Sequence, residues 1–218
     1  MQFERLQISG HSGEPVPNEI VRQDGETDHL AVMLPGFGYT CDMPLVYYAE
    51  SLLLDAGADV FRVEYAYNRR DGFLDLPRDK QRAWLLDDAS AAFRSALSQR
   101  PYDDLIMIGK SLGTLAMGHL LTGEPPPTAR TRAVWLTPLL AEDILRAQMI
   151  DFDGRSLLVI GATDPHYDRA CLDELRAAGH DTMIIDNADH SLDVPGDIAA
   201  SVRAVEQVMQ ALQAFIIA

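Results

Sequence analysis

The sequence predicts an α/β protein built on a mostly parallel, doubly wound sheet, and three observations lead to this fold class. Short apolar runs recur along the chain without polar alternation, as expected of strands that are covered on both faces. Longer amphipathic stretches lie between these runs, and several of them end at a glycine, which is typical of a helix C-terminus. Strands that alternate with helices in this way imply parallel crossover units.

The N-terminal segment differs from the rest and predicts an antiparallel hairpin at an edge of the sheet. Phe3–Ile8 alternates apolar and polar side chains, and Asn18–Gln23 could pair with it across a turn rich in glycine and proline. The apolar runs that follow are Leu30–Leu34, Val60–Tyr65, Leu105–Ile108, Ala133–Thr137, Leu157–Ile160 and Thr182–Ile185. The amphipathic stretches are Leu45–Ala56, Arg78–Gln99, Leu112–Leu121, Glu142–Met149, Tyr167–Ala178 and Asp197–Phe215. The Pro125–Pro127 run is expected to be a loop.

Composition and charge favour a single globular domain over residues 1–218, either monomeric or homodimeric. Hydrophobic residues make up 47% of the chain and charged residues 23%, and the net charge is −15. So acidic a chain repels nucleic-acid phosphates and anionic membrane surfaces, so neither is an expected partner. Cys41 and Cys171 are too few for a disulfide scaffold, and no apolar run approaches the about 18 residues of a membrane helix. We therefore expect a cytoplasmic protein.

The first chemical motif is Gly109-Lys110-Ser111-Leu112-Gly113, a G-x-S-x-G sequence between a predicted strand and a predicted helix. A strand that turns at once into a helix holds the central residue in a strained conformation and exposes its side chain above the sheet, and the glycines leave space for that turn. Ligands of parallel sheets bind beyond the carboxyl ends of the strands, where Ser111 is expected. Ser111 is therefore a candidate nucleophile.

A phosphate-binding loop is the competing interpretation of Gly109-Lys110-Ser111. The first glycine of that motif would fall at position 104, which is Asp104, and strand residues stand where the loop would have to turn. Without a glycine-rich cradle before Lys110, the backbone could not surround a phosphate. The sequence disfavours nucleotide binding.

A serine nucleophile needs a base, and the base needs an orienting carboxylate. His190 follows the last predicted strand and is the best-placed base, although His166 and His180 are also possible. Asp164 follows the penultimate strand and is the main candidate for the acid. The nearer acidic residues Asp186 and Asp189 are more simply explained as turn formers.

An oxyanion would need two backbone donors near Ser111. Glycines flank Phe37 directly after the first central strand, so the backbone can turn sharply there and approach a ligand. The N–H groups of Phe37 and Leu112 could together hold a tetrahedral oxyanion. Pro-Gly-x-Gly is a common turn, however, and does not establish the site alone.

The chain order Ser111, Asp164, His190, together with the G-x-S-x-G turn, resembles the α/β-hydrolase superfamily over nearly the whole chain. The compact size is similar to the dienelactone-hydrolase-like group, although that group's namesake has cysteine as its nucleophile. The resemblance implies Ser111 as nucleophile, His190 as base, Asp164 as acid, and Phe37 and Leu112 as oxyanion donors. It implies no metal and no organic cofactor, and the short interval 138–155 leaves room for little or no lid.

Other residues at the functional edge are weaker candidates for substrate binding. Tyr39, Leu139 and His166 could line the mouth of a pocket or could simply pack in loops. Arg69, with its neighbour Arg70, could hold an anionic group, but ion pairs to nearby Asp71 or Asp75 are the simpler explanation. The sequence does not assign a role to Lys110 either.

The function expected from these residues is hydrolysis of a small ester or thioester through an acyl-enzyme on Ser111. An acyltransferase with an acceptor other than water would share that intermediate. A non-catalytic interaction protein with the same fold is the alternative from another class, although it has no need of an aligned Ser, Asp and His.

Overall fold

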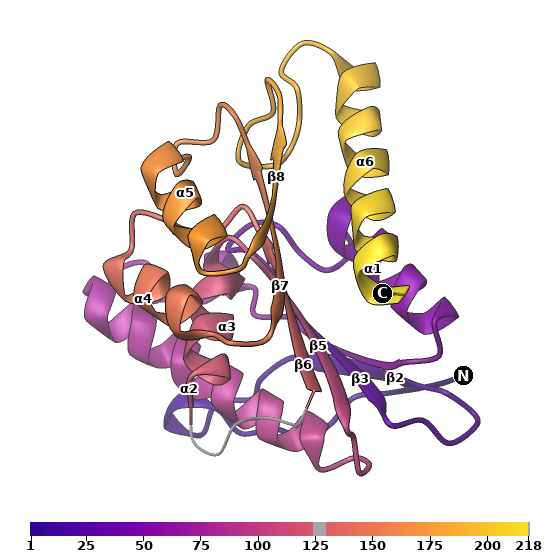
Figure 1. The fold of residues 1–218 in the computed structure, drawn as a ribbon. Coiled ribbons are helices and arrows are strands. Elements are labelled where there is room, and N and C mark those ends of the chain that lie inside the picture. The colour runs from indigo at the N-terminus through magenta and orange to yellow at the C-terminus, as the bar shows by residue number, and fades with distance from the viewer. Residues whose placement is uncertain (124–129, 218) are drawn as a thin grey trace.

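The computed structural model of the protein describes residues 1–123 and 130–217, and its centre is an eight-stranded sheet between two layers of helices (Figure 1). The strands lie in the order β1-β2-β4-β3-β5-β6-β7-β8. Their bounds are β1 Gln2–Glu4, β2 Asn18–Arg22, β3 His29–Leu34, β4 Asp59–Val63, β5 Asp104–Lys110, β6 Arg130–Leu136, β7 Arg155–Gly161 and β8 Asp181–Ile185. The Pro125–Pro127 run lies outside the described residues.

The sheet is mostly parallel with an antiparallel hairpin at one edge, as the sequence predicts. β1 pairs with β2, and β2 with β4, in antiparallel fashion, and the pairs from β4 to β8 are parallel. β1 is shorter than the predicted Phe3–Ile8 strand because the side chain of Asn18 replaces the ladder: it accepts a hydrogen bond from the Leu6 N–H at 3.0 Å and donates one to the Leu6 carbonyl at 2.9 Å. The prediction was therefore right in topology and wrong in the length of the first strand.

Helices cover both faces of the sheet (Figure 1). One face carries α1 Pro44–Asp55 and α6 Ile198–Ile217, and the other carries α2 Arg78–Leu97, α3 Leu112–Leu121, α4 Asp143–Asp151 and α5 Arg169–Ala177. Successive residues of β6 point to opposite faces, so Trp135 is buried under the second group and Val134 under the first. Both faces of the central strands are thus apolar, which explains the absence of polar alternation.

The stretch between β6 and β7 is fully described and holds α4 with its two connecting loops. No cap domain is inserted there, as the interval 138–155 predicts. The carboxyl ends of β3, β5, β7 and β8 therefore meet at an edge of the sheet that no separate domain covers.

The segment after β4 corrects one prediction. The strand ends at Val63 and not at Tyr65, and the chain continues into a 3-10 turn at Tyr67–Arg69. The reason is aromatic packing: the rings of Tyr65 and Tyr67 stack 5.1 Å apart, and Tyr67 stacks on Phe73 at 4.4 Å. Because these buried rings pack in the same core cluster as α2, the chain leaves the sheet after Val63.

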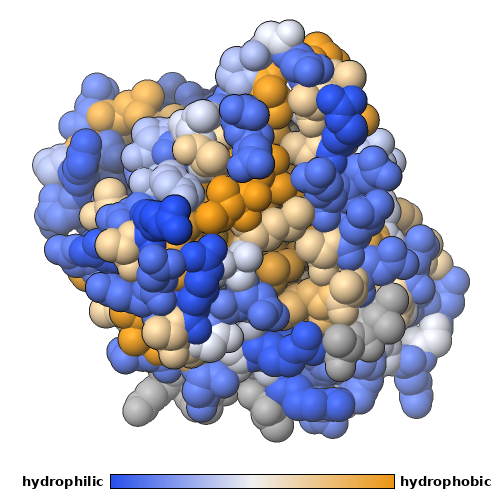
Figure 2. Space-filling view, turned by 45° about the horizontal axis from the view of Figure 1, so that its top comes forward, coloured by the Kyte–Doolittle hydropathy of each residue, from blue (hydrophilic) through white to orange (hydrophobic). Residues whose placement is uncertain are grey.

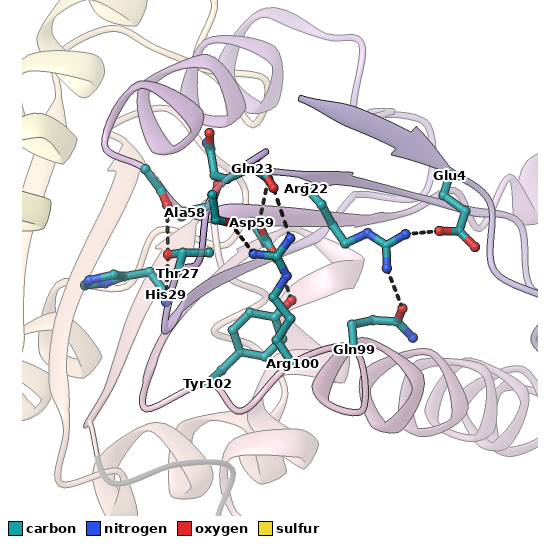
Figure 3. A network of polar contacts seen from close by, with 12 residues as sticks. Glu4, Arg22, Gln23, Thr27, His29, Ala58, Asp59, Gln99, Arg100 and Tyr102 are labelled. Carbon is teal, nitrogen blue, oxygen red and sulfur yellow. Dashed lines mark hydrogen bonds and ion pairs between the residues drawn. The ribbon is translucent and has the colours of Figure 1, made fainter.

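A polar network lies at the amino ends of the parallel strands, on the side of the sheet opposite to Ser111 (Figure 3). The fully buried carboxylate of Asp59, the first residue of β4, accepts hydrogen bonds from the Tyr102 hydroxyl and the Gln23 N–H, both at 2.8 Å. Arg100 lies 3.2 Å from the same carboxylate and also donates to the carbonyls of Gln23 and Gly25. The network therefore joins the loop before β3 to the loop before β5.

Figure 2 turns the upper part of Figure 1 toward the viewer. Hydrophobic side chains gather in a band near the middle of this face, and hydrophilic side chains flank it on both sides.

Within residues 1–123 and 130–217, no helix is both long and apolar enough to cross a membrane.

Candidate active site

Ser111 lies between the end of β5 and the start of α3, in the strained conformation that the motif predicts. Its φ of 51° and ψ of −113° are unfavourable for a residue with a side chain. The glycines on either side make the turn possible. A Cβ on Gly113 would lie 1.9 Å from the Leu34 carbonyl oxygen, and one on Gly109 would lie 3.0 Å from the Gly113 carbonyl oxygen. α3 can therefore start directly against β3 and β5.

The structure brings Ser111, His190 and Asp164 together in a hydrogen-bonded chain. Ser111 Oγ lies 2.7 Å from His190 Nε2, and His190 Nδ1 lies 2.8 Å from Asp164 Oδ2. With the proton on Nδ1, His190 donates to Asp164 and accepts from the Ser111 hydroxyl. Ser111 and His190 are half-buried, whereas the Asp164 side chain is fully buried. This is the order of contacts that a serine nucleophile requires.

Asp164 stays ionised in spite of its burial. Burial opposes the charged form, but hydrogen bonds from His190 and from the His166 N–H, the latter at 2.8 Å, outweigh it, so the pKa of Asp164 lies below its ordinary value. A fixed carboxylate at this position holds the His190 ring in the tautomer that leaves Nε2 free to accept a proton.

The loop that carries His190 is anchored on both sides of the histidine. Asp189 is a turn former, as predicted, because its Oδ1 accepts hydrogen bonds from the N–H groups of Ser191 and Asp193. The Ala188 carbonyl accepts from the hydroxyl and the N–H of Thr163 at 2.8 and 2.9 Å, one residue before Asp164. The loop that carries His190 and the loop that carries Asp164 are thus joined directly.

Other histidines that the sequence left open have different surroundings. His180 is buried between Ser156 Oγ, at 2.6 Å, and the Met149 carbonyl, at 2.8 Å, so it is part of the packing under α5. His166 lies beside the site, with its ring 5.2 Å from that of His190, and burial lowers its pKa. It makes no hydrogen bond to Ser111 in the described structure, whereas His190 does.

The two residues predicted to supply the oxyanion donors line one groove. Neither the Phe37 N–H nor the Leu112 N–H has an acceptor among the described residues. The groove has a volume of about 530 Å³. Its apolar lining consists of Phe37, Phe73, Leu85, Leu112, Leu115 and Leu139. An ion pair of 2.6 Å between Arg82 and Glu142 lies on its rim.

The weaker pocket candidates separate into different positions. Leu139 lines the groove, but Tyr39 does not, because its hydroxyl accepts a hydrogen bond from the Leu45 N–H at 3.1 Å and its ring packs against the Lys110 ammonium. Arg69 is exposed, and its side chain makes no ion pair with another described residue. Arg70 is an ion-pair residue, but the partner predicted for it was wrong.

Arg70 pairs with Asp88 of α2 at 3.6 Å, and not with the predicted Asp71 or Asp75. Its guanidinium lies over the rings of Tyr67 and Trp84 in cation–π contacts. These contacts direct it toward α2 and away from Asp71 and Asp75. The partner is distant in sequence and becomes adjacent only when α2 packs on the sheet.

Sequence reasoning missed the part of the groove that comes from α2 and the environment of Lys110. Phe73, Leu85 and Leu115 lie on or before helices, and their apolar character alone does not distinguish a groove from a core. Lys110 did carry a signal, because a charged residue stands after the apolar run Leu105–Ile108 and directly before Ser111. Its side chain is 1% exposed.

Asp164, His166 and His190 present ligand atoms within 4.8 Å of one another and are the described residues that could hold a metal ion. A metal there would have to displace the hydrogen bond between Asp164 and His190. Because that bond of 2.8 Å completes the chain to Ser111, we assign Asp164 and His190 to the hydrogen-bonded chain and not to a metal site.

Comparisons with known proteins agree with this architecture. No protein-family model matches the sequence, and no curated protein matches it. Among solved structures, a lidless α/β serine hydrolase of Xanthomonas campestris is 18% identical with a TM-score of 0.71, covering 99% of this chain and 94% of that one. Est1E of Butyrivibrio proteoclasticus is 14% identical with a TM-score of 0.71, covering 98% and 97%.

A third similar structure is an esterase of Pyrococcus furiosus, 13% identical with a TM-score of 0.72, covering 99% of this chain and 91% of that one. At these identities the likeness extends to the fold, and it spans practically the whole of each chain. Together with the sheet order and the turn at Ser111, it shows that the protein has the α/β-hydrolase fold.

Proposed function

We propose that this protein is a serine hydrolase that cleaves a small ester or thioester through an acyl-enzyme on Ser111. The observation that carries the proposal is the hydrogen-bonded chain from Ser111 Oγ through His190 to the buried carboxylate of Asp164, with contacts of 2.7 and 2.8 Å. Similar structures that include a named esterase and a named serine hydrolase support the same class of reaction. No metal or organic cofactor takes part in this mechanism.

The reaction begins when Ser111 Oγ attacks the substrate carbonyl and His190 Nε2 takes the serine proton. Negative charge then develops on the carbonyl oxygen, and the free N–H groups of Phe37 and Leu112 stabilise it. His190 returns the proton to the leaving oxygen or sulfur, and the acyl group remains on Ser111. Water activated by His190 then releases the acid and restores the enzyme.

The groove beside the oxyanion donors would take the apolar part of the substrate. Six of its eleven lining residues are aliphatic or aromatic and five are polar or charged, and its volume of about 530 Å³ lies in the range of small-molecule sites. Esters with a short or medium apolar chain should therefore have a higher kcat/KM than acetate esters. Each extra methylene that is buried in the groove contributes about 0.8 kcal/mol to binding.

A panel of acetyl, butyryl and octanoyl esters and one thioester tests this function, with products measured in water and with an added alcohol. Release of free acid supports hydrolysis, and a transferred acyl group indicates an acyltransferase. Leu115→Trp should fill the groove and lower kcat/KM for octanoyl esters more than for acetyl esters. If the wild-type protein hydrolyses none of these compounds, the proposed function is wrong.

A further inference from the structure

The residue directly before the nucleophile is a buried lysine. Lys110 is the last residue of β5, and its side chain lies within the protein at 1% exposure. Burial of an ammonium group is unfavourable unless partners replace the water that it loses. The sequence contains one other lysine, Lys80, which is exposed on α2. Lys110 therefore occupies a position that needs a specific explanation.

Three different loops surround the Lys110 ammonium. Nζ donates to Thr137 Oγ1 at 2.5 Å and to the backbone carbonyl of His190 at 2.7 Å. It also lies 5.0 Å from the centre of the Tyr39 ring, which offers a favourable face to a cation. These partners follow β6, β8 and β3 in turn, so one side chain links the loop of the base, the loop of the oxyanion donor Phe37 and the strand of the nucleophile.

The contact with the His190 carbonyl is the one that bears on the reaction. His190 is 79 positions from Ser111 in the chain, and its ring must stay within hydrogen-bond distance of Ser111 Oγ. A displacement of about 1 Å in such a site can cost about 10²-fold in rate. The bond from Lys110 fixes the backbone of His190 itself, whereas Asp189 and Ala188 anchor only its neighbours.

We propose that Lys110 is a positioning residue, whose ammonium group clamps the backbone of His190 to Thr137 and so keeps the imidazole directed at Ser111. The proposal rests on the proposed function, because it takes His190 as the base. Lys110 makes no hydrogen bond to Ser111 Oγ or to the His190 ring in the described structure, so it acts through His190 and not on the substrate.

The charge state of the clamp makes it sensitive to pH. Burial lowers the pKa of Lys110 to about 8, although the acidic groups of Asp164, Asp189 and Asp193 favour the charged form. The other groups that face it are the neutral Tyr39 ring, the imidazole of His166 and His190 itself. Above that pH the clamp loses its charge, and its hydrogen bonds weaken. Activity should therefore decline on the alkaline side of about pH 8.

Variants at both ends of the clamp test the proposal. Lys110→Met keeps the length of the side chain but removes its donors, and should lower kcat by about 10²-fold with little change in KM. The remaining activity should no longer decline above pH 8. Lys80→Met, which removes the exposed lysine, should behave as wild type. Thr137→Val should lower kcat several-fold, and Thr137→Ser, which keeps the hydroxyl, should restore it.

Two kinetic results would overturn the proposal. The first is a Lys110→Met protein with wild-type kcat and an unchanged alkaline decline. The second is an equal loss in Thr137→Ser and Thr137→Val, because packing and not the hydroxyl would then be responsible. If Lys110→Met does not fold, as judged by circular dichroism, the Thr137 pair decides the question.

A spectroscopic measurement separates this proposal from the proposed function. The proton between His190 Nδ1 and Asp164 should give a far-downfield ¹H NMR signal in wild type, and that signal should broaden or vanish in Lys110→Met. An unchanged signal in the variant contradicts the clamp, whatever the activity. If wild type hydrolyses no ester, the proposed function fails, and the signal still tests whether Lys110 positions His190.

Discussion

At the scale of single residues, the site depends on one buried carboxylate. Asp164 has no exposure to water, yet hydrogen bonds from the His190 ring and from the backbone of His166 stabilise its charged form. The same bonds define which nitrogen of His190 carries the proton. An uncharged residue in place of Asp164 would keep the shape of the site. It would no longer hold His190 in the tautomer that has its proton on Nδ1.

Asp164→Asn is therefore expected to lower kcat by about 10⁴-fold, by analogy with the corresponding change in serine proteases. Asp189→Asn is the matched control, because an amide oxygen can still accept the hydrogen bonds of Ser191 and Asp193. Steady-state kinetics on one ester compares the two variants. Comparable losses would mean that Asp164 has no special role, and a larger loss in Asp189→Asn would place the acid in the final loop.

The stability of the protein at acid pH should also depend on Asp164. Its pKa is lowered on folding from an ordinary value of 3.8, so the unfolded chain binds the proton more readily than the folded protein. The stabilisation is therefore fully present above that value and is lost as the pH falls through the lower, folded pKa. Urea unfolding from pH 7 to 3 should show a smaller acid loss in Asp164→Asn than in wild type, and equal slopes would contradict this account.

The sequence was sufficient to predict residues whose position follows from strand ends, and insufficient for residues whose position follows from packing. Ser111, Asp164 and His190 each lie just after an apolar run, so their meeting can be inferred from parallel topology alone. The pairing of Arg70 with Asp88 could not be inferred, because it depends on how α2 lies against the sheet. The clamp formed by Lys110 depends likewise on three loops that converge only in the folded protein.

At the scale of elements, the site is built where α3 meets β3. Gly113, in the first turn of α3, lies so close to the Leu34 and Pro35 carbonyls that no side chain fits there. This contact brings the N-terminus of the helix beside the loop that contains Phe37. Gly113 is therefore needed for the close packing of α3 against β3 as well as for the turn at Ser111.

Gly113→Ala should lower the free energy of unfolding by about 3 kcal/mol or more, because the new methyl group must push α3 away from β3. It should also reduce kcat, since the Leu112 N–H moves with the helix. Gly25→Ala is a suitable control, because a Cβ there meets nothing within 4 Å. Equal unfolding midpoints for the two variants in urea would contradict the close packing.

Element boundaries show what local sequence patterns omit. The central strands were predicted because both of their faces are apolar. The first strand is cut short by the side chain of Asn18, and β4 ends early because Tyr65 and Tyr67 stack outside the sheet. Both departures come from contacts between side chain and backbone, or between rings, that periodicity does not describe.

At the scale of the whole molecule, opposite edges of the sheet have different roles. The carboxyl edge holds Ser111, Asp164 and His190, and the amino edge is closed by the network around Asp59 (Figure 3). Tyr102→Phe removes one hydrogen bond to that buried carboxylate and should lower the free energy of unfolding by about 1.5–3 kcal/mol. Because the change lies at the far edge, kcat should stay at the wild-type value. A matching loss of kcat would show that the two edges are coupled.

The central claim is that Ser111 is a nucleophile activated by His190, and covalent labelling with a fluorophosphonate tests it most directly. Intact-protein mass spectrometry should show one adduct, peptide mapping should place it on Ser111, and Ser111→Ala should show none. Labelling should depend on the base, so His190→Ala should react far more slowly than wild type. An adduct on another serine, or an equal labelling rate in His190→Ala, would contradict the account.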